Sequence, residues 1–351
     1  MNAGKSGSLA GSFRRLIEST GPISLAHYMG ESNARYYSGK DPLGGEGDFI
    51  TAPEISQMFG ELIGLWLADM WISAGRTEPV HYVELGPGRG TLARDALTAM
   101  RRYGLEPSIH FVETSTALKE IQLDNVRGAT WHNDLSTIPA EGPVLVVGNE
   151  FLDAMPVRQL LKTEQGWREL MVVPRDDKFI CITGDQPMDL AIPEARREAE
   201  VDTLIETSPA AASIVYEVAG RLATQQGAAL FIDYGHDRLR TGSTLQAVKA
   251  HRKVDPFVNP GECDITAHVD FATLGPMAET RGAKLLGTVP QGEWLRALGI
   301  ETRAESLSEF APQYRDEIHS AKDRLIGEGQ MGLLFKVMGL AHKDWPSGVG
   351  F

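Results

Sequence analysis

The amino-acid sequence predicts an α/β fold in which helices cover both faces of a mostly parallel sheet. Three observations lead to this prediction: short apolar runs rich in β-branched residues, helical stretches between them, and a glycine-rich turn after the first run. The apolar runs are residues 79–85, 108–114, 142–150 and 227–235. Because successive positions are apolar, rather than every second one, these runs are typical of strands buried on both faces.

The segments between these runs predict helices, and the carboxyl-terminal part predicts two more strands. The helical segments are residues 91–104, 115–126 and 208–227. The further strands are residues 283–289 and 331–341. Residues 264–282 also predict a helix, which Asp264 or Thr266 would cap. Strands that alternate with helices in this way indicate a doubly wound sheet.

The first part of the chain predicts a helical region that precedes the sheet. Residues 55–75 are strongly apolar and predict a long helix that ends at Gly75, while residues 36–54 are rich in Gly and Pro. Residues 157–184 predict an inserted antiparallel β segment with polar turns. The predicted division is 1–78 for the N-terminal helical region and lid loop, and 79–351 for the main domain, with insertions at about 157–205 and 237–265.

The composition excludes several classes of protein. With 351 residues, 42% of them hydrophobic, and no run of 18 apolar residues, the chain can bury a core and is not expected to insert into a membrane. Its net charge of −13 argues against a nucleic-acid-binding surface, which needs a basic patch. Cys181 and Cys263 stand far apart, so neither a disulfide framework nor a zinc site is predicted. A reducing compartment is favoured: the cytoplasm of a bacterium, or the mitochondrial matrix of a eukaryote.

The stretch HYVELGPGRG, residues 81–90, places glycines at every second position after the first predicted strand. Gly86, Gly88 and Gly90 allow a tight strand-to-helix turn and let a ligand approach the backbone closely. A dinucleotide fingerprint would need its third glycine at position 91, where this chain has Thr91. Glu84 stands at the end of the strand and is predicted to point at the loop. These four residues therefore predict a cofactor site that is not a dinucleotide site.

Two further acids follow the next two strands. Glu113 ends the second strand, where a ribose diol needs a hydrogen-bond acceptor. Asp134 follows the third strand, where it can meet the adenine amino group, and Leu135 lies beside it. A single acid at a strand end is usually just solvated. Three acids in this order, counting Glu84, predict an adenosine-containing cofactor, and the alternative is an ordinary turn in a sheet that binds something else.

The pattern E-x-G-x-G-x-G from Glu84 to Gly90 resembles motif I of the S-adenosylmethionine-dependent methyltransferases. Longer stretches resemble the MidA-like family, which includes the mitochondrial protein-arginine methyltransferase that assists assembly of respiratory complex I. The resemblance covers nearly the whole chain in order, and residues 36–66 and 148–159 are specific to that family. The matching stretches are residues 36–66, 83–95, 148–159, 231–236 and 261–271.

This resemblance implies a class I methyltransferase (Rossmann-like) fold, a seven-stranded sheet whose last strand is antiparallel, with S-adenosyl-L-methionine as cofactor. It also implies methyl transfer to an arginine of a respiratory complex I (NADH dehydrogenase) subunit during assembly. Two alternatives are an assembly chaperone that binds the cofactor without catalysis and a methyltransferase for a small molecule. The insertions would form either a broad surface for a protein substrate or a homodimer interface. No metal ion is predicted, because the sulfonium donor is already activated.

GNEFLDAMP, residues 148–156, ends the fourth strand at the edge where ligands bind in open α/β sheets. Asn149 is a candidate catalytic residue because N-methyltransferases often carry Asn or Asp there, although the usual Pro-Pro-aromatic run is missing. Glu150 and Asp153 would share one face of a helical turn and hold a planar guanidinium between two carboxylates. The alternative is that Glu150 caps the next helix and Asp153 is solvated.

GDFITAPE, residues 47–54, is the second candidate segment. Asp48 and Thr51 are predicted to contact the cofactor from a lid that excludes water, together with Glu54. The alternative is a helix N-terminus, with Thr51 as N-cap and Pro53 in the first turn. Both interpretations can hold together, because a helix start can direct its polar groups into a site.

Overall fold

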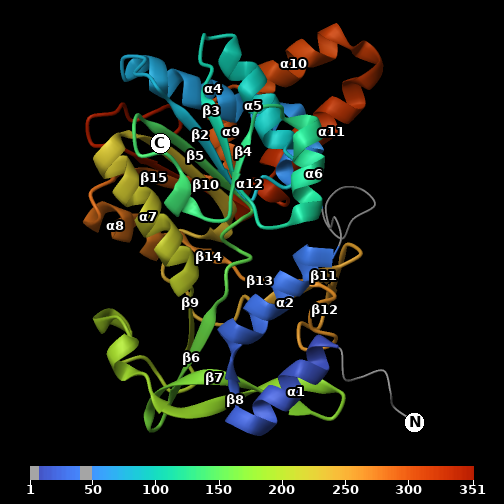
Figure 1. Cartoon of the computed structure of the whole chain (residues 1–351), viewed down its shortest axis with the longest axis vertical. Helices are drawn as coiled ribbons and strands as arrows, with labels where there is room; N and C mark the ends of the chain where they lie inside the picture. The colour runs from blue at the N-terminus through green and yellow to red at the C-terminus, as the bar shows by residue number, and fades with distance from the viewer. Residues whose placement is uncertain (1–7, 40–49) are drawn as a thin grey trace.

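The computed structural model describes residues 8–39 and 50–351. A large mixed sheet forms the upper half of the molecule in Figure 1, in the strand order β4-β3-β2-β5-β10-β16-β15. All neighbours from β4 to β10 pair in parallel, whereas β16 is antiparallel to both β10 and β15. The strands are β2 (His81–Leu85), β3 (Ser108–Val112), β4 (Thr130–His132), β5 (Val144–Asn149), β10 (Gly227–His236), β15 (Lys284–Pro290) and β16 (Phe335–Ala341).

This sheet confirms the predicted class I arrangement, in which the last strand is the antiparallel one. A short strand that the sequence did not predict, β14 (Val269–Asp270), also pairs in parallel with the end of β10. Helices cover both faces of the sheet. They are α4 (Gln57–Ser73), α5 (Thr91–Arg101), α6 (Thr116–Asn125), α7 (Pro209–Gln225), α8 (Phe271–Thr280), α9 (Gln291–Ala297), α10 (Ile300–Phe310), α11 (Arg315–Ile326) and α12 (Met331–Leu334), with 3-10 turns η1 (Leu135–Thr137) and η4 (Pro312–Tyr314).

Alternate side chains of the central strands enter two separate cores. Leu145 and Val147 of β5 pack with α4, α5 and α9 to α12, whereas Val144 and Val146 pack with α7 and α8 on the opposite face. All four side chains are almost fully buried. Burial on both faces explains why this strand is a continuous apolar run in the sequence.

Helices α4 and α5 approach each other very closely. A Cβ at Gly64 would overlap the backbone of Ala96, and one at Gly60 would lie 2.8 Å from the Cβ of Asp95. The absence of side chains at these two positions lets the helices touch through their backbones. Because α5 begins at Thr91, directly after the glycine-rich turn, the packing of α5 against α4 fixes the position of the end of the turn.

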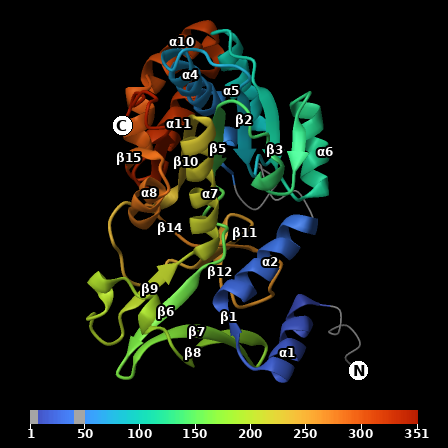
Figure 2. The ribbon, with the colours of Figure 1, turned by 60° about the vertical axis from the view of Figure 1, so that its left-hand side comes forward.

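A second group of elements lies below the main sheet in Figures 1 and 2. It contains a five-stranded antiparallel sheet, which confirms the inserted β segment, and a three-stranded sheet of order β12-β11-β13. Phe13, Tyr28 and Phe179 share one core with residues from both sheets. The elements are β1 (Ile23–Ser24), β6 (Arg158–Thr163), β7 (Gly166–Arg175), β8 (Lys178–Pro187), β9 (Leu204–Thr207), β11 (Gln246–Lys249), β12 (Arg252–Val254), β13 (Asp264–Thr266), α1 (Leu9–Thr20), α2 (Leu25–Gly39), η2 (Asp189–Ala191) and η3 (Glu194–Arg196). The short helix α3 (Ala52–Ile55) instead packs against α4, α5 and α11 beside the main sheet.

One predicted helix begins later than expected. Residues Asp264–Thr266 form β13, paired with β11, and α8 begins only at Phe271 with Asp270 as its N-cap. The side chain of Asn33 on α2 gives Ile265 a second partner: its Nδ2 donates to the Ile265 carbonyl at 2.7 Å, and its Oδ1 accepts the Ile265 N–H at 3.1 Å. These long-range bonds hold the segment extended, so the expected caps at Asp264 and Thr266 are wrong. Among the residues described, no helix has both the length and the apolar character needed to cross a membrane.

Candidate active site

A pocket of about 410 Å³ opens at the carboxyl ends of β2, β3 and β5, a volume in the range of small-molecule sites. Helices α2 and α3 close its other side. The sheet side is lined by Glu84, Gly86, Gly88, Glu113, Asn149 and Glu150. The helix side is lined by Asn33, Ala34, Tyr37, Thr51, Pro53 and Glu54. The structure therefore gathers into one cavity residues that lie more than a hundred positions apart in the sequence.

The glycine-rich turn forms one wall of this pocket. Gly86, Gly88 and Gly90 have φ of 60°, 55° and 80°, the left-handed region that side chains disfavour. A Cβ at Gly86 would lie 2.7 Å from Cδ2 of Phe151, which also lines the pocket. Gly90 is the N-cap of α5 and does not line the pocket, so its part is to shape the turn. The turn is a cradle of bare backbone that a small ligand can approach.

Glu84 lies at the base of the pocket with only 3% of its surface exposed. The hydroxyl of Tyr82 donates a hydrogen bond to its Oε2 at 2.5 Å. Burial raises the pKa of Glu84 to about 8, although the bond from Tyr82 opposes the shift. The carboxyl group is thus held ready to take a negative charge when a positively charged ligand group enters.

The raised pKa of Glu84 predicts a pH-dependent stability. The folded protein holds the Glu84 proton more tightly than the unfolded chain does, because the pKa of this carboxyl group is 4.5 in the unfolded chain. Its contribution to the free energy of unfolding is therefore full below about pH 4.5 and is lost as the pH rises through about 8. We expect Glu84→Gln, which cannot ionise, to raise Tm at pH 8.5 by several degrees relative to the wild type, and much less at pH 5. Differential scanning calorimetry without ligand measures this. Glu164→Gln, on the exposed β6–β7 turn, is the control, and an equal Tm difference at both pH values for Glu84→Gln would contradict the prediction.

Glu113, at the end of β3, lines the pocket with a carboxylate whose position is fixed. Its Oε1 accepts the backbone N–H groups of Thr114 and Ser115, each at 2.8 Å. Its Oε2 accepts Nε2 of Gln122 from α6 at 3.2 Å. Gln122 is fully buried, and the sequence analysis did not identify it. A glutamine on an amphipathic helix carries no signal of such a role.

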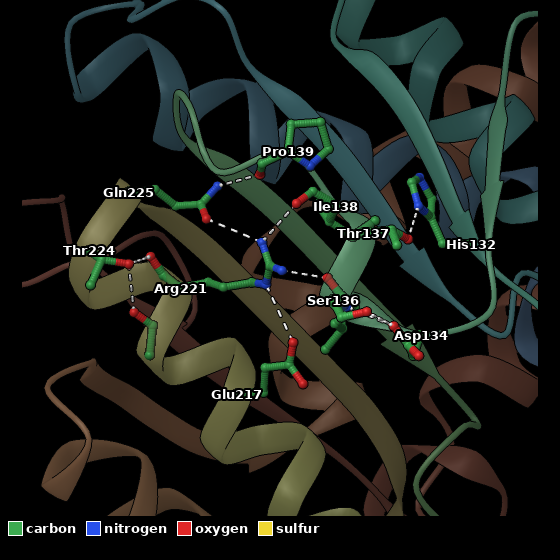
Figure 3. A network of polar contacts seen from close by, with 12 residues as sticks. His132, Asp134, Ser136, Thr137, Ile138, Pro139, Glu217, Arg221, Thr224 and Gln225 are labelled. Atoms are coloured by element: carbon green, nitrogen blue, oxygen red, sulfur yellow. Dashed lines mark hydrogen bonds and ion pairs between the residues drawn. The ribbon is translucent and has the colours of Figure 1, made fainter.

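Asp134 and Leu135 lie near the site but do not line the pocket. The Asp134 side chain is exposed and caps η1 by accepting the Ser136 N–H at 2.8 Å, while Leu135 is buried in the core beneath α7. Figure 3 shows how α7 holds this turn: Arg221 donates to the Leu135 and Ile138 carbonyls. The segment after β4 is therefore tied to α7. The contact of Asp134 and Leu135 with adenine stays a prediction.

Asn149 and Glu150 stand together where β5 ends. Nδ2 of Asn149 donates to Oε1 of Glu150 at 3.2 Å, and the same oxygen accepts the Ala52 N–H of α3 at 2.8 Å. Oδ1 of Asn149 is buried without a hydrogen-bond partner in the described part of the chain. Burial raises the pKa of Glu150 to about 7. Two adjacent residues of the pocket wall thus combine an amide oxygen that lacks a hydrogen-bond partner among the described residues with a carboxyl group that ionises near neutral pH.

The prediction that Glu150 and Asp153 share one face of a helical turn is wrong. No helix forms here, and Glu150 itself has φ of 49°. Asp233 at the end of β10 holds this turn instead: its Oδ2 accepts the N–H groups of three successive residues, 151 to 153, at 2.9 to 3.2 Å. Asp153 is buried and does not line the pocket, and the hydroxyl of Tyr234 donates to its carboxylate. Asp233 therefore positions the turn that presents Glu150.

The helix side of the pocket combines α2 and α3. Thr51 occupies the N-cap position of α3, as one interpretation proposed, but its side chain makes no capping bond. Oε1 of Glu54 accepts the Thr91 hydroxyl at 2.5 Å, which joins α3 to the start of α5. Asp48 lies outside the described residues. Long-range contacts bring α2 to the pocket, among them the docking of Asn33 onto β13 and the hydrogen bond from the Tyr37 hydroxyl to Asp264.

The pocket fits an adenosine-containing sulfonium cofactor. A bare backbone cradle, an acid at its base and a second acid at the next strand end match the parts of such a molecule. The fold and the site define a class I methyltransferase. Comparison with known proteins supports this: a family model of S-adenosyl-L-methionine-dependent methyltransferases matches residues 62–289, and the chain belongs to this family.

Several known proteins are similar to this chain over nearly its whole length. A Drosophila melanogaster protein named protein arginine methyltransferase NDUFAF7 homolog, mitochondrial, is 37% identical over 98% of this chain and 89% of its own length. The mouse protein arginine methyltransferase NDUFAF7, mitochondrial, is 37% identical over 92% and 82%. A crystal structure from Burkholderia thailandensis with bound S-adenosyl-homocysteine superposes with a TM-score of 0.82 at 32% identity, over 95% of this chain and 91% of that one. The protein is an S-adenosylmethionine-dependent methyltransferase of the MidA-like family.

Proposed function

We propose that this methyltransferase modifies an arginine side chain of a protein, a subunit of respiratory complex I during its assembly. The observation that carries the proposal is the pair of pocket-lining residues Glu150, a carboxyl group whose pKa is raised to about 7, and Asn149, whose Oδ1 has no hydrogen-bond partner in the described part of the chain. Relatives at 35–37% identity are named protein arginine methyltransferases, which supports the same acceptor. The choice of complex I rests on the resemblance of the longer sequence stretches to the MidA-like family.

A guanidinium group matches this wall chemically. It is planar, carries five N–H donors and has no acceptor, so it needs oxygen atoms as partners. Asn149 Oδ1 can accept one N–H, and Glu150 can accept another as a carboxylate. Two contacts to one planar group would fix its rotation in the pocket.

The electrostatics around Glu150 favour a cationic acceptor. Asp153 and Asp233 lie behind it, and the negative charge of Asp153 contributes to its raised pKa. An entering guanidinium cation would offset this repulsion and shift Glu150 toward the carboxylate. Bound S-adenosylmethionine supplies an electrophilic methyl group. The chain's own part is to orient the acceptor nitrogen and to provide, at Glu150, a base for the proton that the nitrogen must lose.

Methyl transfer from labelled S-adenosylmethionine into a lysate of the source organism depleted of this enzyme tests the proposal. We expect label on arginine in a protein of the size of a complex I subunit, and none when Glu150→Gln replaces the wild type. Label in the small-molecule fraction would contradict a protein acceptor. Binding of S-adenosylhomocysteine without any transfer, even to subunits under synthesis, would instead indicate an assembly chaperone.

A further inference from the structure

Gln122 on α6 is a fully buried polar side chain that makes three hydrogen bonds within the cofactor site and does not itself line the pocket. Its Nε2 lies 2.7 Å from the Gly88 carbonyl and 3.2 Å from Oε2 of Glu113, and its Oε1 lies 2.7 Å from Nε1 of Trp131. These partners belong to the glycine-rich turn, the end of β3 and strand β4. One amide therefore joins three segments that surround the ligand.

The orientation of this amide is determined by its partners. The indole N–H of Trp131 can only donate, so the atom facing it must be the amide oxygen. The NH2 group then faces a carbonyl and a carboxylate, both of which only accept at neutral pH. Both amide hydrogens and the oxygen are used. If the amide rotated by 180°, its oxygen would face the Gly88 carbonyl and the Glu113 carboxylate, which are acceptors themselves.

This arrangement fixes the Glu113 carboxylate before a ligand arrives. A carboxylate has about four acceptor positions. Thr114 and Ser115 occupy two on Oε1, and Gln122 occupies one on Oε2. One position on Oε2 is left for a ligand, in the part of the chain that the structure describes. A group held in this way loses little conformational freedom when it binds.

The same helix holds the glycine-rich turn at a second point. One turn further along α6, Nδ2 of Asn125 donates to the Arg89 carbonyl at 2.8 Å. Gln122 and Asn125 lie three positions apart and so face the same way. The distance between the turn and Glu113 is therefore set by α6, through Gln122.

We propose that Gln122 is a positioning residue for ribose recognition: it fixes the spacing between the Gly88 carbonyl and the Glu113 carboxylate, so that the enzyme selects a cofactor with ribose hydroxyls. The inference concerns cofactor binding and does not depend on arginine being the acceptor. Its failure can therefore be told apart from failure of the proposed function.

Calorimetric titration with S-adenosylhomocysteine and with its 2′,3′-dideoxy analogue tests the proposal. For Gln122→Met, of similar volume, we expect S-adenosylhomocysteine to bind about 10- to 100-fold more weakly, as for a lost charge-assisted hydrogen bond. The analogue should bind almost as it does to the wild type, so that ribose selectivity falls by about the same factor. Gln122→Glu keeps the acceptor for Trp131 and loses both donors, and the same loss of selectivity is expected from it.

A matched control is the same change at Gln159, whose buried side chain donates to Glu206 and Ser243 outside the pocket. Gln159→Met should leave selectivity unchanged. If the Gln122 variants bound both ligands more weakly by the same factor, the role of Gln122 would be purely structural and the proposal would be overturned. Unchanged selectivity in Glu113→Ala would also overturn it, because the ribose would then be held elsewhere.

Discussion

Gly86→Val is expected to weaken the binding of S-adenosylhomocysteine strongly while leaving the protein folded. A valine at φ of 60° costs about 1–2 kcal/mol, and its side chain would press on Phe151, 2.7 Å from the new Cβ, at a further cost of about 1–3 kcal/mol. The turn would relieve both costs by moving away from the geometry that cradles the ligand. At about 1.4 kcal/mol per tenfold, a total of about 2–5 kcal/mol predicts binding about 30- to 4,000-fold weaker in calorimetric titration.

Gly104→Val separates the two effects. Gly104 has φ of 76° and nothing within 4 Å of a Cβ, and it lies outside the pocket. It should lose stability through backbone strain alone and bind S-adenosylhomocysteine normally. Near-normal affinity in Gly86→Val would mean that the cofactor does not lie against this turn.

Glu150→Gln is expected to lower the rate of methyl transfer by about 10²- to 10³-fold, the usual loss when one preorganised charged partner is removed. The amide keeps an oxygen for the Ala52 N–H, so α3 should stay in place and S-adenosylhomocysteine should bind as to the wild type. The rate is measured with labelled cofactor and an arginine-containing acceptor. Glu206→Gln, where the wild-type carboxylate accepts the Thr244 N–H outside the pocket, is the control and should keep the full rate.

The pH profile of the wild type gives a second measure of the same role. Since burial raises the pKa of Glu150 to about 7, kcat/KM should fall as the pH drops below about 7 and the carboxylate takes up a proton. This fall of kcat/KM at low pH, the acid limb of the profile, should be absent in Glu150→Gln. A full transfer rate in that variant, or an unchanged acid limb, would move the guanidinium contact to another residue.

The sequence alone determined the main sheet and the glycine-rich part of the site. Strands such as β5 are apolar at every position because both faces are buried, and that pattern is visible without coordinates. The turn from Gly86 to Gly90 was equally readable, because only glycine accepts its left-handed backbone readily. Glu84 and Glu113 followed from the rule that parallel strands bring their carboxyl ends to one edge.

The features that only the tertiary structure decided depend on contacts between segments far apart in the sequence. Glu150 lines the pocket and Asp153 does not, in a turn whose backbone N–H groups at 151–153 bind Asp233, about eighty residues later. Helix α2 forms a wall because Asn33 pairs with Ile265. Local patterns fix which backbone conformations are favourable, whereas a buried polar side chain takes its role from the partner that folding brings within about 3 Å. Gln122 shows this most clearly, since nothing near it in the sequence distinguishes it from a surface glutamine.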